Sequence, residues 1–191
     1  MASHGSGLET RQRLMRAATD VVKQHGPAAL TLEAVADAAG VSKGGLLYHF
    51  PNKDALIEGM VDDVLRRFEA DVEMASQTES HGEGRWLRAF VKTTFAAEPE
   101  HDLSVGLLAA AAVNPGLLAP VGRYFANWQA RATADGVDAT LATVVRLADD
   151  GIWFSDLFDA APPGEELRAS VLDALLDLIA AGVSPKNEEG V

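Results

Sequence analysis

A short stretch of the sequence, Ser42 to His49, gathers side chains that are well suited to contacting a nucleic acid. The stretch is SKGGLLYH, and it offers a lysine ammonium, two kinds of hydroxyl, a histidine ring and two small glycines. Ammonium, hydroxyl and imidazole groups donate hydrogen bonds to phosphate oxygens and to the edges of bases. This pattern therefore predicts a surface that presses against a phosphate backbone and reads base edges.

Two short helices joined by a tight turn are expected to position these groups. The first helix has apolar residues at helical spacing on one face, namely Leu32, Val35, Ala36 and Ala39. Gly40 supplies the sharp turn, and Ser42 is a good N-cap for the second helix. Leu46, Leu47 and Phe50 are expected to form the buried side of that second helix. Pro51 then ends it, because proline disfavours the helical conformation in the preceding residue.

Two longer helices are predicted to flank this pair. One spans residues 8–25, ends at Gly26-Pro27 and is expected to support the pair rather than to read bases. The other spans residues 53–76, with Asn52 as its cap, Lys53 in its first turn and a continuous apolar stripe. This helix is the only covalent connection between the first part of the chain and the rest, so any signal between them has to move it.

The segment from Leu14 to Ile57 resembles the DNA-binding domain of the TetR family of bacterial repressors. The matching positions are Ala17-Ala18, Gly26, Thr31, Val35-Ala36, Ala39-Gly40-Val41-Ser42, Gly44, Tyr48, His49-Phe50, Lys53 and Leu56. The form GLLYHFP is similar to that of a branch with multidrug-responsive members. Gly45 departs from many members of the family, and because it has no side chain, base readout is expected to depend on Lys43, Ser42 and DNA shape.

The resemblance implies a set of DNA contacts and a mode of regulation. The implied contacts are Thr31, Ser42, Lys43, Gly44, Gly45, Leu46, Tyr48, His49 and Lys53. Capping of the following helix is enough to explain a threonine at position 31, so contact between Thr31 and phosphate is an alternative role. The family resemblance also implies a homodimer that binds a palindromic operator and is released by a small molecule. Whether the chain represses or activates cannot be read from the sequence.

The second part of the chain carries aromatic residues and acids that are candidates for binding a ligand. The sequence RLADDGIWFSDLF resembles a segment near the penultimate helix of the same branch. A carboxylate beside aromatic rings suits a cationic ligand. The predicted ligand contacts are Trp86, Phe90, Tyr124, Phe125, Trp128, Asp149, Trp153 and Phe154. The alternative is that these aromatics are simply core residues and that the acids are paired or exposed.

The last two predicted helices, residues 138–160 and 164–181, are apolar on more than one face. Such helices need more burial than one small body gives, and a four-helix interface between two copies would supply it. The resemblance implies dimerisation at the same place.

Composition places the acidic charge outside the predicted DNA-binding part. The 191 residues carry a formal net charge of −12. Residues 1–58 contain six basic and six acidic residues, whereas residues 59–191 contain ten basic and 22 acidic ones. An acidic body would repel DNA and help to orient the head towards it, although an acidic surface also simply keeps a protein soluble.

The sequence predicts an all-α protein with about nine helices in four segments. Residues 1–7 are a disordered leader, 8–52 the DNA-binding domain, 53–182 the ligand-binding and dimerisation domain, and 183–191 a disordered tail. The chain contains no cysteine and no apolar stretch long enough to span a membrane, which fits a cytoplasmic location. No cofactor is expected. The five histidines include no i,i+4 pair, so no metal site is expected either.

Two other classes of function are alternatives to a DNA-binding regulator. An all-α enzyme would have to use Asp149, Asp150 or Asp156 with His101, but the sequence contains no nucleophile motif, phosphate-binding loop or dinucleotide fingerprint. Asp149 and Asp150 are adjacent, so on a helix they point about 100° apart and make a poor acid–base pair. A ligand-binding module without DNA function is the other alternative, and the retained Ser42, Lys43, Tyr48, His49 and Lys53 argue against it.

Overall fold

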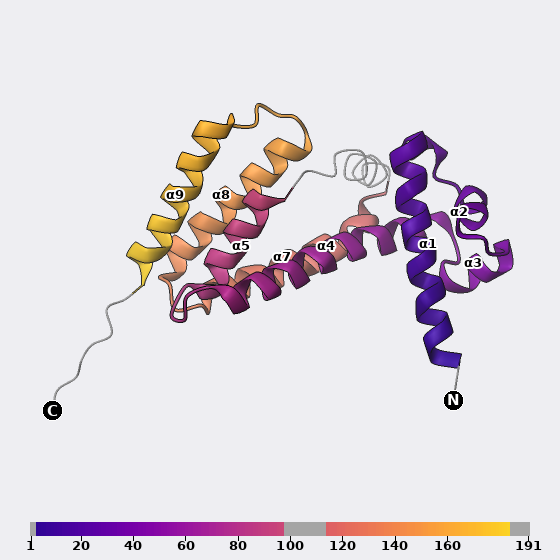
Figure 1. Ribbon diagram of the computed structural model, residues 1–191, viewed down its shortest axis with the longest axis horizontal. Helices are drawn as coiled ribbons and strands as arrows, with labels where there is room; N and C mark the ends of the chain where they lie inside the picture. The colour runs from indigo at the N-terminus through magenta and orange to yellow at the C-terminus, as the bar shows by residue number, and fades with distance from the viewer. Residues whose placement is uncertain (1–2, 98–113, 184–191) are drawn as a thin grey trace. The chain divides into compact units, whose positions relative to one another are not determined.

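The computed structural model describes residues 3–97 and 114–183, and the regular structure of these residues is helical throughout (Figure 1). The elements in chain order are α1 (Ser3–His25), η1 (Pro27–Ala29), α2 (Leu32–Ala39), α3 (Lys43–His49), α4 (Lys53–Thr78), α5 (Arg85–Ala96), η2 (Pro115–Leu118), α7 (Ala119–Thr133), α8 (Ala139–Leu157) and α9 (Glu165–Gly182). Eight of these are α-helices, close to the nine predicted, and the all-α prediction is confirmed.

Several helix boundaries differ from those that the sequence predicted. α1 begins at Ser3 rather than at residue 8, so residues 3–7 of the predicted leader continue the helix. Once α1 is nucleated by its packed residues, each added residue gains one backbone hydrogen bond at little cost. α8 ends at Leu157 because Asp159 and Ala161 have positive φ angles and Pro162 follows. The helix predicted from Asp102 to about Asn114 falls on residues 98–113, which lie outside the described part of the chain.

The described residues form two compact units. The first unit, called the head here, consists of residues 3–66 and 114–123, and the second, called the body, consists of residues 67–97 and 124–183. α4 runs through both units, so its first half belongs to the head, whereas the sequence assigned the whole helix to the body. The leader, head, body and tail boundaries predicted from the sequence otherwise stay predictions.

The head is built on one buried core beneath α1, α2 and α3. Its fully buried side chains are Leu14, Val22, Val35, Leu46, Leu56 and Met60. α1 packs against α2, and α2 packs against α3. Fully burying an aliphatic side chain of this size stabilises a fold by about 1.5–3 kcal/mol. This core is what holds the two short helices, neither of which is long enough to be stable alone.

The turn between α2 and α3 is closed by local backbone geometry. Gly40 has a φ of 64° in the left-handed region, which glycine adopts without strain. The N–H of Val41 donates to the carbonyl of Ala36 at 3.0 Å, and the N–H of Gly40 donates to the carbonyl of Asp37 at 3.1 Å. These bonds satisfy the last carbonyls of α2 and turn the chain sharply. The predicted role of Gly40 is therefore confirmed.

In the body, α5, α8 and α9 pack against one another (Figure 1). The start of α8 is tied to the end of α9, because the N–H of Asp138 donates to the carbonyl of Gly182 at 2.8 Å. A Cβ atom on Gly182 would lie only 2.6 Å from Cγ1 of Val137. Glycine is therefore required here by the close approach of the two segments.

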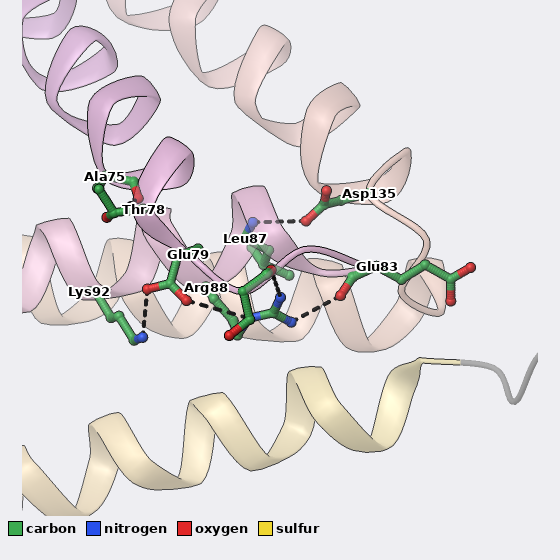
Figure 2. A network of polar contacts seen from close by, with 9 residues as sticks. Ala75, Thr78, Glu79, Glu83, Leu87, Arg88, Lys92 and Asp135 are labelled. Carbon is green, nitrogen blue, oxygen red and sulfur yellow. Dashed lines mark hydrogen bonds and ion pairs between the residues drawn. The ribbon is translucent and has the colours of Figure 1, made fainter.

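A polar network fixes the turn between α4 and α5 (Figure 2). Glu79 accepts a hydrogen bond from Lys92 at 2.6 Å and lies 3.7 Å from the guanidinium of Arg88. Arg88 in turn donates to the backbone carbonyls of Glu83 and Ser80 at 2.9 and 3.1 Å. Burial raises the pKa of Asp135, whose carboxylate accepts from the N–H of Leu87 at 2.9 Å at the start of α5. The network holds the N-terminal end of α5, which carries Trp86 and Phe90.

Candidate DNA-binding and ligand-binding sites

The outward face of α3 presents most of the predicted DNA contacts. Tyr48 is 85% exposed, Lys43 and Gly44 are exposed, and His49 is half-buried. The rings of Tyr48 and His49 meet edge to face with their centroids 5.1 Å apart. The side chain of Tyr48 is thus mostly exposed to solvent, with the His49 ring as its ring contact. The Tyr48 hydroxyl is free to donate to a phosphate or to a base edge.

The other polar predicted contacts lie at the first residues of three helices. Oγ1 of Thr31 accepts from the N–H of Ala34 at 3.1 Å, and Oγ of Ser42 accepts from the N–H of Gly45 at 3.1 Å. Lys53 is the exposed first residue of α4. Both hydroxyl oxygens act as caps, but a hydroxyl that accepts one bond can still donate its proton to an anion. Capping and phosphate contact are therefore compatible at Thr31 and Ser42.

Leu46 is a correction to the list of predicted DNA contacts. Its side chain is 0% exposed and belongs to the core of the head, whereas its neighbour Leu47 is 38% exposed. The two leucines point about 100° apart on the helix, and here Leu46 faces inward while Leu47 lies towards the edge of the outer face. The sequence grouped both with the buried side, and nothing local distinguished them. Leu47 is the leucine that shares the outer face.

Gly45 is tightly placed, which the sequence did not indicate. A Cβ atom there would lie 3.3 Å from Oγ of Ser42, whereas a Cβ on Gly44 would meet nothing within 4 Å. The serine cap and the small residue at position 45 thus fit together. A side chain at Gly44 would instead project into open space on the outer face.

Lys43 has a partner that the sequence did not predict. Its ammonium donates to Oε1 of Glu33 at 2.5 Å and joins the first turn of α3 to the first turn of α2. The hydrogen bond and the charge of Lys43 lower the pKa of Glu33. Ten residues separate the two, and no helical spacing connects them. Only the geometry of the turn at Gly40 brings them together.

A pocket of about 310 Å³ lies in the head behind His49. It is lined by Arg11, His49, Phe50, Ala55, Glu58, Gly59, Asp62, Pro120 and Arg123. The guanidinium of Arg11 lies 5.2 Å from the centroid of the Phe50 ring, and Arg123 lies 3.9 Å from Asp62. His49 therefore both lines this pocket and contacts the ring of Tyr48.

In the body, five of the predicted ligand contacts belong to one cluster of rings. The Phe90 ring lies 5.1 Å from Trp86 and 5.5 Å from Trp128. Tyr124 and Phe125 lie 5.9 and 5.2 Å from Trp128. Phe68, which the sequence did not single out as a ligand contact, joins the cluster at 5.3 Å from Phe90. The indole N–H groups of Trp86 and Trp128 are both buried without a hydrogen-bond acceptor.

Asp149 is buried next to this cluster. It is 1% exposed, its Oδ2 accepts from the hydroxyl of Thr94 at 2.7 Å, and its Oδ1 has no partner. Thr94 lies one turn after Phe90 on α5, and its hydroxyl is also 3.3 Å from the carbonyl of Phe90. Burial raises the pKa of Asp149 well above its usual range, against the effect of the Thr94 hydroxyl. Leaving a buried carboxyl oxygen unpaired is costly, so a group that pairs with it would bind favourably.

The neighbouring acids have different partners. Asp150 forms an ion pair with Arg146 at 2.5 Å, and Asp156 binds Arg168 at 2.8 Å. Both acids are therefore neutralised within the body, as the alternative interpretation of the sequence allowed. Asp149 is the acid of this segment that remains incompletely paired.

Trp153 and Phe154 are not brought into the ring cluster. Among the described residues, their ring contacts are with each other at 4.9 Å and from Phe154 to Phe158 at 6.0 Å. Trp153 is half-buried and lies one turn after Asp149 on α8, whereas Phe154 is exposed on another face. Of these two predicted ligand contacts, only Trp153 lies on the same side of α8 as Asp149.

Neither a metal centre nor a membrane span is found in the described part of the chain. Its residues contain no group of three or more histidines and acids arranged to hold a metal ion. None of its helices combines the length and the apolar character that crossing a bilayer requires.

Comparison with known proteins identifies the family. The model of bacterial regulatory proteins of the tetR family matches residues 14–60. The model of the tetracyclin repressor-like C-terminal domain matches residues 84–180, which is just over half of the chain. The chain belongs to the TetR family. The resemblance seen in the sequence is thereby confirmed, and the family consists of transcriptional regulators rather than enzymes, as predicted.

The curated relatives of this TetR-family chain match it over less than half of its length. It is 33% identical over 75 residues to the transcriptional regulator TtgR of Pseudomonas putida, a match that covers 39% of this chain and 34% of TtgR. The matches span about a quarter to a third of the curated relatives.

Solved structures match almost the whole TetR-family fold. A TetR transcription regulator from Haloarcula marismortui has a TM-score of 0.72 at 19% identity, with 93% of this chain and 100% of that chain covered. The multidrug binding protein EbrR in complex with malachite green has a TM-score of 0.64 at 26% identity, with 88% and 97% covered. Most of this TetR-family chain thus has the fold of EbrR, which was solved in complex with a small molecule.

Proposed function

We propose that this chain is a ligand-responsive transcriptional regulator, acting as a repressor, that binds a palindromic operator as a homodimer. The observation that carries the proposal is the exposed face of α3, where Lys43, Gly44 and Tyr48 lie beside two capped helix starts. Helix N-termini and cationic or hydroxyl side chains on one surface suit a phosphate backbone, and a short exposed helix suits a major groove.

The proposed DNA contacts follow from this face. They are Thr31, Ser42, Lys43, Gly44, Gly45, Tyr48, His49 and Lys53. Leu46 is left out because it is buried; it supports the helix from below. Lys43 and Tyr48 are the side chains of α3 with the reach to touch base edges, while the residues at the helix starts would hold phosphates. The proposed place of action is the cytoplasm, where bacterial DNA is found.

The proposed effector is an aromatic cation that binds in the body. The buried and incompletely paired carboxyl of Asp149 supports this proposal, because a positive group beside it would favour the ionised carboxylate and balance its charge. Trp86, Phe90 and Trp128 would contact its rings, with Tyr124, Phe125 and Trp153 nearby. Malachite green, the ligand of EbrR, is a dye of this chemical class. Phe154 is not included among these contacts, because its side chain is exposed on another face of α8.

The proposed dimer interface lies on α8 and α9. These helices expose large apolar side chains, namely Val144, Leu147, Phe154, Phe158 and Leu167. Spacings of three and seven residues place Val144, Leu147 and Phe154 along one stripe of α8, and Phe158 follows as its C-cap. A second copy would bury this stripe in a two-fold arrangement, as the sequence predicted.

Release of DNA is proposed to depend on α4, which is continuous from Lys53 to Thr78. An effector can shift the protein towards release only if it binds the DNA-incompetent state more tightly. α4 would carry that difference, since it holds Lys53 at one end and continues into the body. α4 would thus connect the head, which contains its residues 53–66, to the body, which contains its residues 67–78.

The test is a selection from a random pool of DNA duplexes by the purified protein, repeated at moderate salt. We expect one palindrome to be enriched, and we expect Lys43→Ala and Tyr48→Ala to bind it at least about tenfold more weakly while melting like the parent. Arg16→Ala, which removes one positive charge from the exposed face of α1, is the matched control and should lose much less. If no duplex is enriched by a folded dimer, the proposal is wrong.

A further inference from the structure

An ion pair between Lys43 and Glu33 occupies the lysine that is proposed to contact DNA. Lys43 is the first residue of α3 and the lysine of that helix. Glu33 lies in the first turn of α2. Their side chains are 58% and 70% exposed, and their charged atoms lie 2.5 Å apart. The pair therefore lies on the outer surface of the head, between the two helix starts.

Glu33 is negatively charged whenever DNA could bind. The hydrogen bond and the charge of Lys43 lower the pKa of its carboxyl, so the ion pair is complete at neutral pH. Its position is unfavourable for DNA, because a phosphate at the capped start of α2 would face this carboxylate. Lys43 cannot approach a phosphate or a base fully while it stays on Glu33.

We propose that Glu33 competes with DNA for Lys43 and thereby lowers the affinity of the head for DNA. This inference rests on the proposed DNA-binding function. Lys43 leaves Glu33 only when the new partner is better than an exposed carboxylate. A well-placed pair of acceptors on a base edge meets that condition, whereas a phosphate in a loosely docked, non-specific complex does not. Lys43 thus contributes to operator binding but is withheld from non-specific DNA.

The variant Glu33→Gln tests this idea, because it removes the charge and keeps the shape. With Lys43 free, we expect binding to a scrambled duplex to tighten about three- to tenfold. Binding to the selected operator should tighten by at least as much, because Lys43 then no longer has to leave the carboxylate of Glu33. The salt dependence of non-specific binding should steepen by about one released counterion, the expected effect of one additional phosphate contact.

Two further variants separate the proposal from a general charge effect. Asp37→Asn removes an equal charge from the exposed side of the same helix and should change both duplexes alike and only slightly. In the background of Lys43→Ala, the substitution Glu33→Gln should have a clearly smaller effect on both duplexes, because only the direct repulsion between the carboxylate and phosphate is then removed. Glu33→Ala gives a second version of the test, and circular dichroism checks folding of each variant.

The assay is fluorescence anisotropy with the duplex selected by the parent protein and a scrambled duplex of equal length and composition. The proposal is overturned if Glu33→Gln leaves both affinities unchanged, if Asp37→Asn gives the same gain, or if the gain is undiminished without Lys43. Selection of an operator together with any of these results would leave the proposed function standing and remove only the role of Glu33. Failure to select an operator would remove both.

Discussion

Asp149 gives the sharpest quantitative test of the body, through the substitution Asp149→Asn. The side chain is buried, one oxygen accepts from Thr94, and the other oxygen has no partner. Asparagine has the same shape and can still accept from Thr94, but it carries no charge at any pH. The variant therefore removes the ionisable group and leaves the packing in place.

The sign of the effect follows from the raised pKa of Asp149 in the folded protein. Above its ordinary value of 3.8, the unfolded chain releases the proton while the folded chain keeps it. The folded state then binds more protons, so stability falls as pH rises, until the pH passes the folded pKa. Each pH unit in that window costs about 1.4 kcal/mol. At pH 7 the cost is at most about 4 kcal/mol, reached if the carboxyl stays neutral throughout.

Asp149→Asn should therefore be about as stable as the parent near pH 4 and increasingly more stable towards pH 7. Urea unfolding of both proteins at several pH values measures the difference, in which the titration of groups that do not interact with Asp149 cancels. The adjacent Asp150→Asn is the contrast, because it removes the partner of the buried Arg146 and should destabilise by about 1–3 kcal/mol. A difference between Asp149→Asn and the parent that is independent of pH, or negative at pH 7, would refute the reasoning.

Two further predictions concern the head and the effector. Leu46→Ala should lower the free energy of unfolding by about 2–5 kcal/mol in urea titrations. The equivalent change at the exposed Leu47 should lower it by under about 0.5 kcal/mol. Similar losses for both variants would contradict the assignment of the buried face. Asp149→Asn should weaken binding of malachite green about tenfold or more in a fluorescence titration, because the buried counter-charge is lost. Asp173→Asn, which removes an equal charge from the surface of α9, should leave that affinity unchanged, and equal losses in both variants would argue against a role for Asp149.

The sequence determined the local structure of the head, because the responsible interactions are local. Gly40, the caps at Thr31 and Ser42, and Pro51 act within a few residues of their positions, and each does what the sequence predicted. The density of matching positions from Leu14 to Ile57 likewise indicates the family, because each position carries its own local constraint. Charge, helix content and the apolar character of the last two helices are also visible in composition and spacing.

Tertiary structure decided the questions that involve residues far apart in the sequence. Whether Leu46 or Leu47 is buried depends on which face meets the core under α1. The pairing of Lys43 with Glu33 depends on the angle of the turn between them. Asp149 differs from Asp150 and Asp156 because arginines reach the latter two, while Thr94, 55 residues away in the chain, supplies a single bond to Asp149. Hydrophobic periodicity predicts which helix faces are apolar, whereas the residues that each face contacts depend on how the helices pack in three dimensions.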